Sequence, residues 1–282
     1  MQEKCKMFGG YEFQEIEGDA HVGNMHASTR IGNVRENQED AVLIMQHPDP
    51  VIDDFKMMVV ADGMGGMSNG EVASSLIIKE MKAWFEKLDV DYYSYSKNLT
   101  EELRAAIQDV NRKMWKKNID EYQESGSTIV VAVTCQNITI VANVGDSRAY
   151  IIENQGISQI TDDDSPVYYL WKQGKIKEKD DIRFHKESNL ITQFMGIDEE
   201  VVPQIAGVKR SIPVILCSDG VSDCLSDDEI LSTAQVTDGN ELAKALVMKA
   251  LSTESKAREG LGAKYNKLIP AGKDNATVAY MW

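Results

Sequence analysis

The sequence predicts an α+β fold in which antiparallel sheets are covered by helices. Short apolar runs rich in β-branched residues indicate buried strands. Two of these runs are separated only by Gln136 and Asn137, which predicts an antiparallel hairpin, because parallel neighbours need a long crossover. Helical patterns are interspersed with the strand groups, which favours this class over a doubly wound parallel sheet. The runs lie at residues 55–61, 129–135, 138–144, 213–217 and 277–281.

Helices are predicted from apolar periodicity and from capping residues. Apolar residues recur on one face of the segment 103–114, and Thr100 is the expected N-terminal cap of that helix. Ser226 and Glu229 stand three positions apart, as in a capping box, and predict the start of another helix. Two further helices are expected at residues 71–88 and 240–251.

The chain length and the absence of repeats or Pro-rich linkers predict one domain over residues 1–282, with residues 1–25 treated as peripheral. The formal net charge of −15 would repel the phosphates of nucleic acids and anionic lipid surfaces, and no basic stripe offsets it. We therefore expect neither a nucleic-acid partner nor a membrane partner.

The cysteines and the N-terminal segment bear on the compartment. The 4 cysteines show neither the spacing of a zinc site nor the density of a disulfide scaffold, so reduced thiols are expected. The first 20 residues lack the apolar run of a signal peptide, and no apolar stretch is long enough to span a membrane. A soluble, cytoplasmic protein is the expectation.

Aspartates stand at the ends of several predicted strands. Asp62 and Asp219 each end an apolar run and precede a glycine, Asp274 stands just before the last run, and Asp146 follows the run at 138–144. One Asp-Gly pair alone is a favoured turn, but the repetition points to a shared site. Hard cations such as Mg²⁺ and Mn²⁺ prefer oxygen ligands, whereas the 4 histidines show no metal-ligand spacing, so zinc is the weaker choice.

A second candidate segment is GNVRENQEDAV, in which Arg35 lies five positions before Asp40. A guanidinium fork can hold two phosphate oxygens at once. Glu39 and Asp40 could orient waters around a metal ion. The alternative is a solvated charged loop.

In chain order, these segments resemble the metal-dependent protein phosphatase family, the protein phosphatase 2C type, in its bacterial form. The resemblance implies an α-β-β-α sandwich of two antiparallel sheets flanked by helices. It also implies hydrolysis of phosphoserine and phosphothreonine in proteins. The matching stretches, between residues 32 and 278, are GNVRENQEDA, VVADGMGGMSNGEVAS, SGSTIVVAV, NVGDSRAY, ILCSDGVSD and KDNATV.

The resemblance assigns a metal centre for Mn²⁺ or Mg²⁺. It implies that Asp62 bridges two cations and that the carbonyl of Gly63 binds one of them. Asp219 and Asp274 would complete the ligands of the other cation. Asp146, together with Asp219, corresponds to a third and weaker cation position.

The remaining roles that the resemblance implies concern water and substrate. Asp40 and Glu39 would bind the cations through water, and Arg35 would grip the substrate phosphate. The chain departs from the family pattern at Asp164, where histidine is usual, and at Met67, where histidine is common. Met64 replaces a histidine of the animal relatives, which removes one candidate general acid.

The expected reaction is one-step hydrolysis by a water that bridges two cations, without a covalent intermediate. The sequence contains no Cys-x5-Arg loop, no GxSxG elbow and no Walker-type loop. The partner is a phosphorylated protein, and a cognate serine/threonine kinase is a further candidate partner. Two alternatives stay open: a catalytically silent pseudophosphatase that only binds, and a metal-dependent esterase of small phosphoesters.

Overall fold

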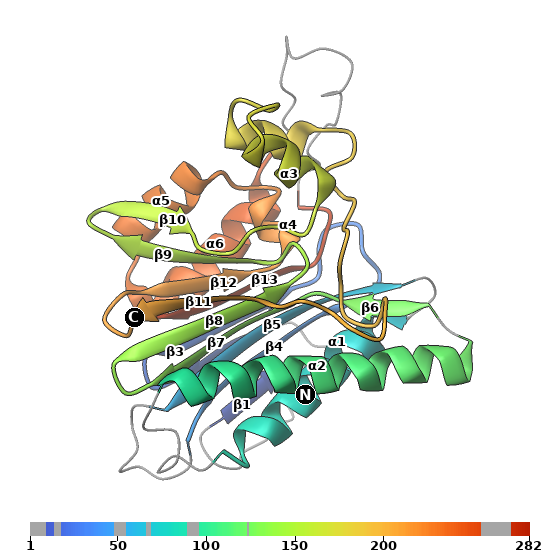
Figure 1. The fold of residues 1–282 in the computed structure, drawn as a ribbon. Coiled ribbons are helices and arrows are strands. Elements are labelled where there is room, and N and C mark those ends of the chain that lie inside the picture. Colours follow the sequence, from blue (N-terminus) through green and yellow to red (C-terminus); the bar gives the residue numbers. More distant parts are fainter. Residues whose placement is uncertain are drawn as a thin grey trace.

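The fold is taken from a computed structural model of the chain, and its description covers residues 10–13, 18–47, 55–65, 69–88, 96–122, 124–254 and 272–282. Two sheets lie face to face, with α1 and α2 outside one sheet and α4, α5 and α6 outside the other (Figure 1). All strand pairings among the described residues are antiparallel. The predicted α+β class and the α-β-β-α sandwich are confirmed.

In the first sheet the short β6 pairs with the far end of β5. Its strands, in spatial order, are β1 (Gly10–Phe13), β4 (Asp40–Gln46), β5 (Lys56–Gly65), β7 (Ile129–Cys135), β8 (Ile138–Val144) and β11 (Gln204–Lys209), with β6 (Ser125–Ser127) beside β5. The predicted hairpin of residues 129–135 and 138–144 is β7 and β8.

In the second sheet the last strand of the chain, β13, lies between β12 and β3. Its strands, in spatial order, are β10 (Gly156–Gln159), β9 (Arg148–Glu153), β12 (Val214–Cys217), β13 (Ala276–Met281), β3 (Met25–Arg30) and β2 (Gly18–Val22).

The helices differ in length and in the layer they cover. Within the described residues, no helix has both the length and the apolar character needed to span a lipid bilayer. The helices are α1 (Asn69–Phe85), α2 (Ser96–Glu121), α3 (Pro166–Lys172), the 3-10 helix η1 (Lys179–Phe184), α4 (Asp219–Ser222), α5 (Asp227–Val236) and α6 (Gly239–Ser252).

Three apolar layers hold the sandwich together, and β5 shows how one strand contributes to two of them. Successive side chains of a strand point to opposite faces of the sheet. Met57 and Val59 therefore join the layer beneath α1 and α2, while Met58 and Val60 join the layer between the two sheets. A third layer lies between the second sheet and the helices α5 and α6.

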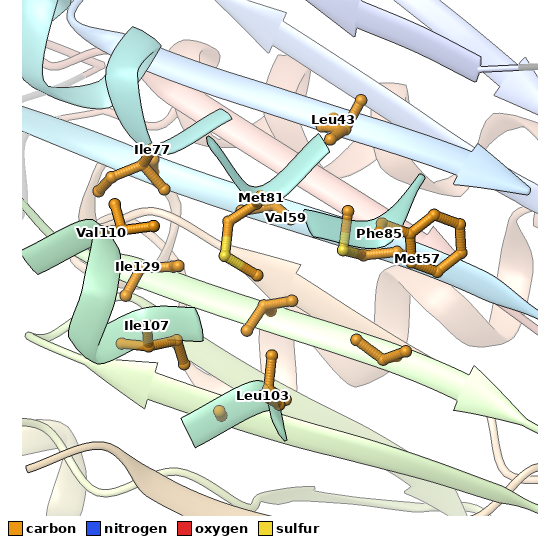
Figure 2. Close-up of a cluster of buried hydrophobic side chains, with 14 of the residues drawn as sticks. Leu43, Met57, Val59, Ile77, Met81, Phe85, Leu103, Ile107, Val110 and Ile129 are labelled. Atoms are coloured by element: carbon orange, nitrogen blue, oxygen red, sulfur yellow. The ribbon is translucent and has the colours of Figure 1, made fainter. Parts of the chain in front are cut away.

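Figure 2 shows the layer beneath α1 and α2, where Met81 of α1 lies close to Val59 of β5. At one end of this layer the rings of Phe55 and Phe85 stack with centroids 4.8 Å apart. Both rings are buried. The layer fixes α1 against the strand that carries Asp62.

The capping box at Ser226 is confirmed: its side chain accepts from the amide of Glu229, and the Glu229 side chain accepts from the amide of Ser226. The expected cap at Thr100 is wrong, because α2 begins at Ser96. Leu99 is fully buried and extends the apolar face by one turn, so burial carries the helix past the predicted start.

We expect Phe85→Ala to lower the free energy of unfolding by about 3–5 kcal/mol, because it removes a buried ring and leaves a cavity under α1. Val236→Ala, at an apolar side chain that is 86% exposed, is the matched control and should change it by less than about 0.5 kcal/mol. Denaturant unfolding at a fixed metal concentration measures both. Equal effects of the two substitutions would contradict the layer described above.

Candidate active site

Five aspartates that the sequence singles out lie together where strand ends of both sheets meet. Asp40 begins β4 and is the cross-strand partner of Asp62 in β5, while Asp146 follows β8. From the second sheet, Asp219 follows β12 and Asp274 precedes β13. The charges of the other four all act on Asp62, which makes them one cluster.

Asp62 is held by backbone and hydroxyl contacts, not by a turn. Strand β5 runs past Asp62 to Gly65, so the expected strand end at Asp62 is wrong. The amide of Asp62 donates to the hydroxyl of Thr128 at 3.1 Å, and its carbonyl accepts from the hydroxyl of Ser127 at 2.9 Å and from the amide of Thr128 at 2.9 Å. These contacts anchor the backbone on both sides of the carboxylate.

Gly63 lies inside β5 and does not form the turn that the sequence suggests. Its amide donates to the carbonyl of Glu39 at 3.1 Å. A Cβ at this position would overlap the carbonyl of Gly70, in the first turn of α1. Glycine is therefore needed for close approach of the helix, and the hydroxyl of Ser74 in α1 donates to the same Glu39 carbonyl at 2.6 Å.

Two residues not assigned from the sequence, Ser218 and Asn275, join the two sheets at the cluster. The hydroxyl of Ser218 donates to Oδ2 of Asp40 at 2.7 Å and accepts from the amide of Thr277 at 3.1 Å. The side chain of Asn275 accepts from the amide of Glu39 at 2.8 Å. Each stands directly beside a predicted aspartate, which is the sequence signal that could have identified them.

Arg35 lies at the rim of the cluster and contacts Asp274 through both arms of its fork. Nε lies 2.7 Å from Oδ1 of Asp274, and Nη2 lies 2.9 Å from Oδ2. Nη1 lies 3.4 Å from a carboxylate oxygen of Glu39. The Arg35 side chain is 47% exposed, so it is accessible from solvent while it faces the carboxylates.

Burial and the repulsion between neighbouring charges raise the pKa values of Asp40, Asp62, Asp146 and Asp219. Burial raises the pKa of Asp62 well above its usual range, and the charges of Asp40 and Asp219 raise it further. Burial also raises the pKa of Asp219 well above its usual range, and the charges of Asp274 and Asp146 raise it further. Burial raises the pKa of Asp40 and of Asp146 to about 7 each.

The donor set of this cluster fits hard divalent cations. One oxygen of Asp40 and one of Asp146 are buried and accept no hydrogen bond from the described residues. A cation would satisfy such oxygens and relieve the repulsion that raises these pKa values. No three His, Cys, Asp or Glu side chains in the described part of the chain enclose a metal ion by themselves. Carboxylates that do not enclose an ion by themselves suit cations that keep several waters, as Mg²⁺ does.

Asp164, which stands where the family usually has histidine, holds a turn of the backbone by hydrogen bonds. The amide of Gly145 donates to Oδ2 of Asp164 at 2.9 Å, and the amide of Asp164 donates to the carbonyl of Gly145 at 3.0 Å. Gly145 has a φ of +106°, a conformation that glycine adopts readily. Asp164 thereby holds the turn that presents Asp146.

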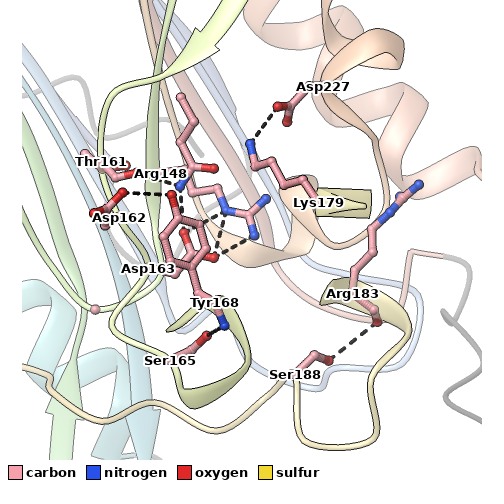
Figure 3. Close-up of polar contacts among 12 residues, drawn as sticks. Arg148, Thr161, Asp162, Asp163, Ser165, Tyr168, Lys179, Arg183, Ser188 and Asp227 are labelled. Atoms are coloured by element: carbon pink, nitrogen blue, oxygen red, sulfur yellow. Dashed lines mark hydrogen bonds and ion pairs between the residues drawn. The ribbon is translucent and has the colours of Figure 1, made fainter. Parts of the chain in front are cut away.

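A polar network anchors the segment that follows Asp164 (Figure 3). Arg148 is buried, and Nη2 of its guanidinium lies 2.7 Å from Oδ2 of Asp163, while Nε lies 2.9 Å from Oδ1. Lys179 of η1 reaches Asp227, at the start of α5, with 2.6 Å between Nζ and Oδ2. His185 is buried and accepts at Nδ1 from the amide of Glu187. Met67 lies outside the described residues.

Comparisons with known proteins agree with this arrangement. The profile of the family described as Protein phosphatase 2C matches residues 24–168. A curated relative, the serine/threonine phosphatase stp of Listeria monocytogenes, is 30% identical over 238 residues, which cover 81% of this chain and 90% of the relative.

Solved structures extend the likeness to the whole sandwich. The serine/threonine phosphatase Stp1 from Staphylococcus aureus superposes with a TM-score of 0.77 at 29% identity, covering 96% of this chain and 98% of that one. The catalytic domain of the serine/threonine protein phosphatase PstP, crystallised in complex with 2 manganese ions, gives a TM-score of 0.70 at 27% identity, with 91% and 96% of the two chains covered.

We expect the metal-free protein to lose stability as the pH rises from about 4 to about 7. The folded-state pKa of Asp40 and Asp146, about 7, exceeds the ordinary value near 3.9, so the native state binds more protons than the unfolded state in this window. Thermal unfolding in chelator should therefore give a higher Tm at pH 5.5 than at pH 7.5.

Asp146→Asn separates the effect of the buried carboxyl groups on stability from the general effect of the net charge, because the variant lacks one of the carboxyl groups whose pKa is raised. Its Tm should vary less with pH than that of the wild type. A steeper or unchanged dependence in the variant would contradict the assigned electrostatics.

Proposed function

This chain belongs to the protein phosphatase 2C family, and from that premise we propose how its residues carry out the reaction. It is a metal-dependent serine/threonine protein phosphatase, homologous to the stp and PstP enzymes. The proposal concerns the assignment of the site residues, the number of cations and the course of hydrolysis. The observation that carries it is the cluster of five aspartates at the junction of the two sheets.

We assign two cations, Mn²⁺ or Mg²⁺, to this cluster, with a third and weaker position. Asp62, which faces all the other carboxylates, would be shared by two cations, with the carbonyl of Gly63 as a further ligand. Asp219 and Asp274 would hold the second cation, and Asp146 with Asp219 the third. Asp40 and Glu39 would act through water.

Hydrolysis is proposed to occur by direct attack of water, in one step. The bound cations would supply the acidity that makes a water molecule nucleophilic at neutral pH and would neutralise phosphoryl charge. Among the described residues, burial raises the pKa of the two thiols near the cluster, Cys217 and Cys224, so neither is a substitute nucleophile as a thiolate. Cys217 is fully buried, and burial raises the pKa of its thiol to about 12, so it stays protonated.

Arg35 is proposed to bind the substrate phosphate. Its fork lies at the exposed rim and already engages a carboxylate with two parallel contacts, which is the geometry that also suits two phosphate oxygens. Arg35 would exchange part of its contact with Asp274 for the phosphate when substrate enters. Lysine could not reproduce this planar contact.

The substrate is proposed to be a phosphorylated protein. A cognate serine/threonine kinase, a cytoplasmic location and a single-domain organisation stay predictions from the sequence. All five aspartates are present and clustered, which supports an enzyme over the pseudophosphatase alternative. Parallel assays on a phosphothreonine peptide and on nucleotides would separate the protein phosphatase from the small-ester alternative.

We expect Asp62→Asn to lose activity by several orders of magnitude, because the amide removes the charge that two cations would share. Phosphate release from a phosphothreonine peptide, with Mn²⁺ and then with excess chelator, measures this. The control is Asp109→Asn, at an exposed carboxylate of α2, which should match the wild type. Near wild-type turnover by Asp62→Asn, or full wild-type activity in chelator, would refute the assignment.

We expect Arg35→Lys to raise KM for the phosphopeptide by about tenfold, because it exchanges a bidentate contact for a point charge. Arg112→Lys is the matched control, since Arg112 also pairs with a carboxylate, Asp109, but on the outer helix α2, where its side chain is 49% exposed. Steady-state kinetics at saturating Mn²⁺ compares the two. An unchanged kcat/KM for Arg35→Lys would remove Arg35 from the site.

A further inference from the structure

A cavity of about 530 Å³ lies beside the carboxylate cluster, at the end of β5 that extends past Asp62. Its walls come from four parts of the chain. They are Met64 and Gly65 of β5, Ser125 and Gly126 of β6, the loop at residues 194–197, and the C-terminal half of α2. The proposed catalytic residues do not line it.

Several large apolar side chains line the cavity, which is open to solvent. Trp115 of α2 and Phe194 of the loop form part of its wall. Two aliphatic side chains at its edge are unusually accessible, Ile119 at 52% and Ile197 at 41%. Large exposed apolar side chains gathered around one hollow are typical of binding sites.

Hydrogen bonds hold the walls in place, so the cavity is formed before any ligand arrives. The side-chain amide of Asn118 donates to the carbonyl of Ser125 at 2.6 Å and to that of Gly196 at 3.2 Å. The hydroxyl of Ser125 donates back to Asn118 at 2.8 Å. On the other side, the amide of Gly196 donates to the side chain of Asn111 at 2.8 Å.

Hydrogen bonds of the buried Ser127, which follows Gly126 of the cavity wall, link the cavity to the proposed active site. The amide and carbonyl of Ser127 pair with Met195 of the loop, at 3.2 and 2.8 Å, while its hydroxyl donates to the carbonyl of Asp62. Gly126, next to it, lies against the ring of Phe194 so closely that a Cβ there would overlap the ring. A substrate placed at Asp62 therefore has this cavity as its neighbour.

We propose that this cavity binds a large apolar side chain of the phosphoprotein substrate, about three residues from the phosphorylated serine or threonine. Gly65 lies three positions beyond Asp62 on an extended strand, or about 10 Å at ~3.3 Å per residue. An extended substrate peptide spans that distance with three residues. The proposal rests on the proposed function, because it needs the phosphate at the aspartate cluster.

The charge of the cavity rim also favours a peptide with few acidic residues. Glu124 is exposed and lines the cavity, and the chain as a whole has a net charge of −15. An acidic peptide segment would be repelled there, whereas a neutral or basic one would not. The site thus selects an apolar residue with neutral or basic neighbours.

The test is a series of phosphothreonine peptides with alanine at every flanking position except one, which carries leucine or tryptophan. Wild-type kcat/KM should rise by about tenfold when the apolar residue lies two to four positions from the phosphothreonine on one side. The same residue at other positions should have little effect. A flat profile along the peptide would overturn the proposal.

Two variants test whether the cavity causes the preference. Ile119→Ser and Trp115→Ala should each reduce the ratio between the preferred peptide and the all-alanine peptide to nearly one. Both should retain wild-type rates on p-nitrophenyl phosphate, which is too small to reach the cavity. Val236→Ser, at an exposed apolar side chain of α5, is the control and should keep the full ratio.

Other outcomes identify other occupants or roles. The proposal would be overturned by a variant that keeps the peptide ratio, or by one that loses hydrolysis of the peptide and of p-nitrophenyl phosphate to the same extent. It would also be overturned by a variant in which sedimentation shows a changed oligomeric state as the only effect. Wild-type protein without Mn²⁺-dependent hydrolysis of any substrate would instead contradict the proposed function. In that case, calorimetric binding of the same peptides to the wild type and to Ile119→Ser still tests the cavity, and equal affinities would overturn it.

Discussion

Repulsion among buried carboxylates is the constraint on which the rest of this structure depends. Asp62 and Asp219 lie close enough to other aspartates that burial and neighbouring charges together raise their pKa values far above the usual range. Such a cluster destabilises the fold unless cations or protons neutralise it. The protein therefore has to hold these groups together by contacts that do not depend on their charge.

The contacts that achieve this are hydrogen bonds made by the uncharged side chains of serine, threonine and asparagine. Ser218 binds a carboxylate of the first sheet from its position in the second, and Asn275 does the same for the backbone at Glu39. Thr128 holds the amide of Asp62. Because these three side chains lie at strand ends in packed sheets, the carboxylates keep their places while their charge state changes. A preorganised site of this kind binds cations without first paying for rearrangement.

The sequence alone predicts those parts of the structure that leave a local pattern. The hairpin of β7 and β8 follows from two apolar runs and a two-residue connection, and the helix at Ser226 follows from its capping box. Strand β6 has only the letters SGS and is recognised by its pairing with β5, not by its composition. The helix start at Ser96 likewise depends on the burial of Leu99.

The site also has some features that leave a local sequence pattern and others that depend on tertiary contacts. The aspartates are visible in the sequence because each stands beside an apolar run, and their number argues for a shared function. The contact between Ser218 and Asp40 joins residues 178 positions apart, so no local pattern could show it. The pairing of Arg35 with Asp274 and the cavity beside Met64 also depend on the tertiary arrangement.

The most direct test of the shared cation site is anomalous scattering from a crystal of this protein grown with Mn²⁺ and measured at the manganese absorption edge. We expect strong anomalous peaks among the carboxylates of Asp62, Asp219 and Asp274, with Asp62 in contact with two of them. Manganese bound elsewhere on the acidic surface, with no peak in contact with Asp62, would contradict the assignment of the cluster as the metal centre.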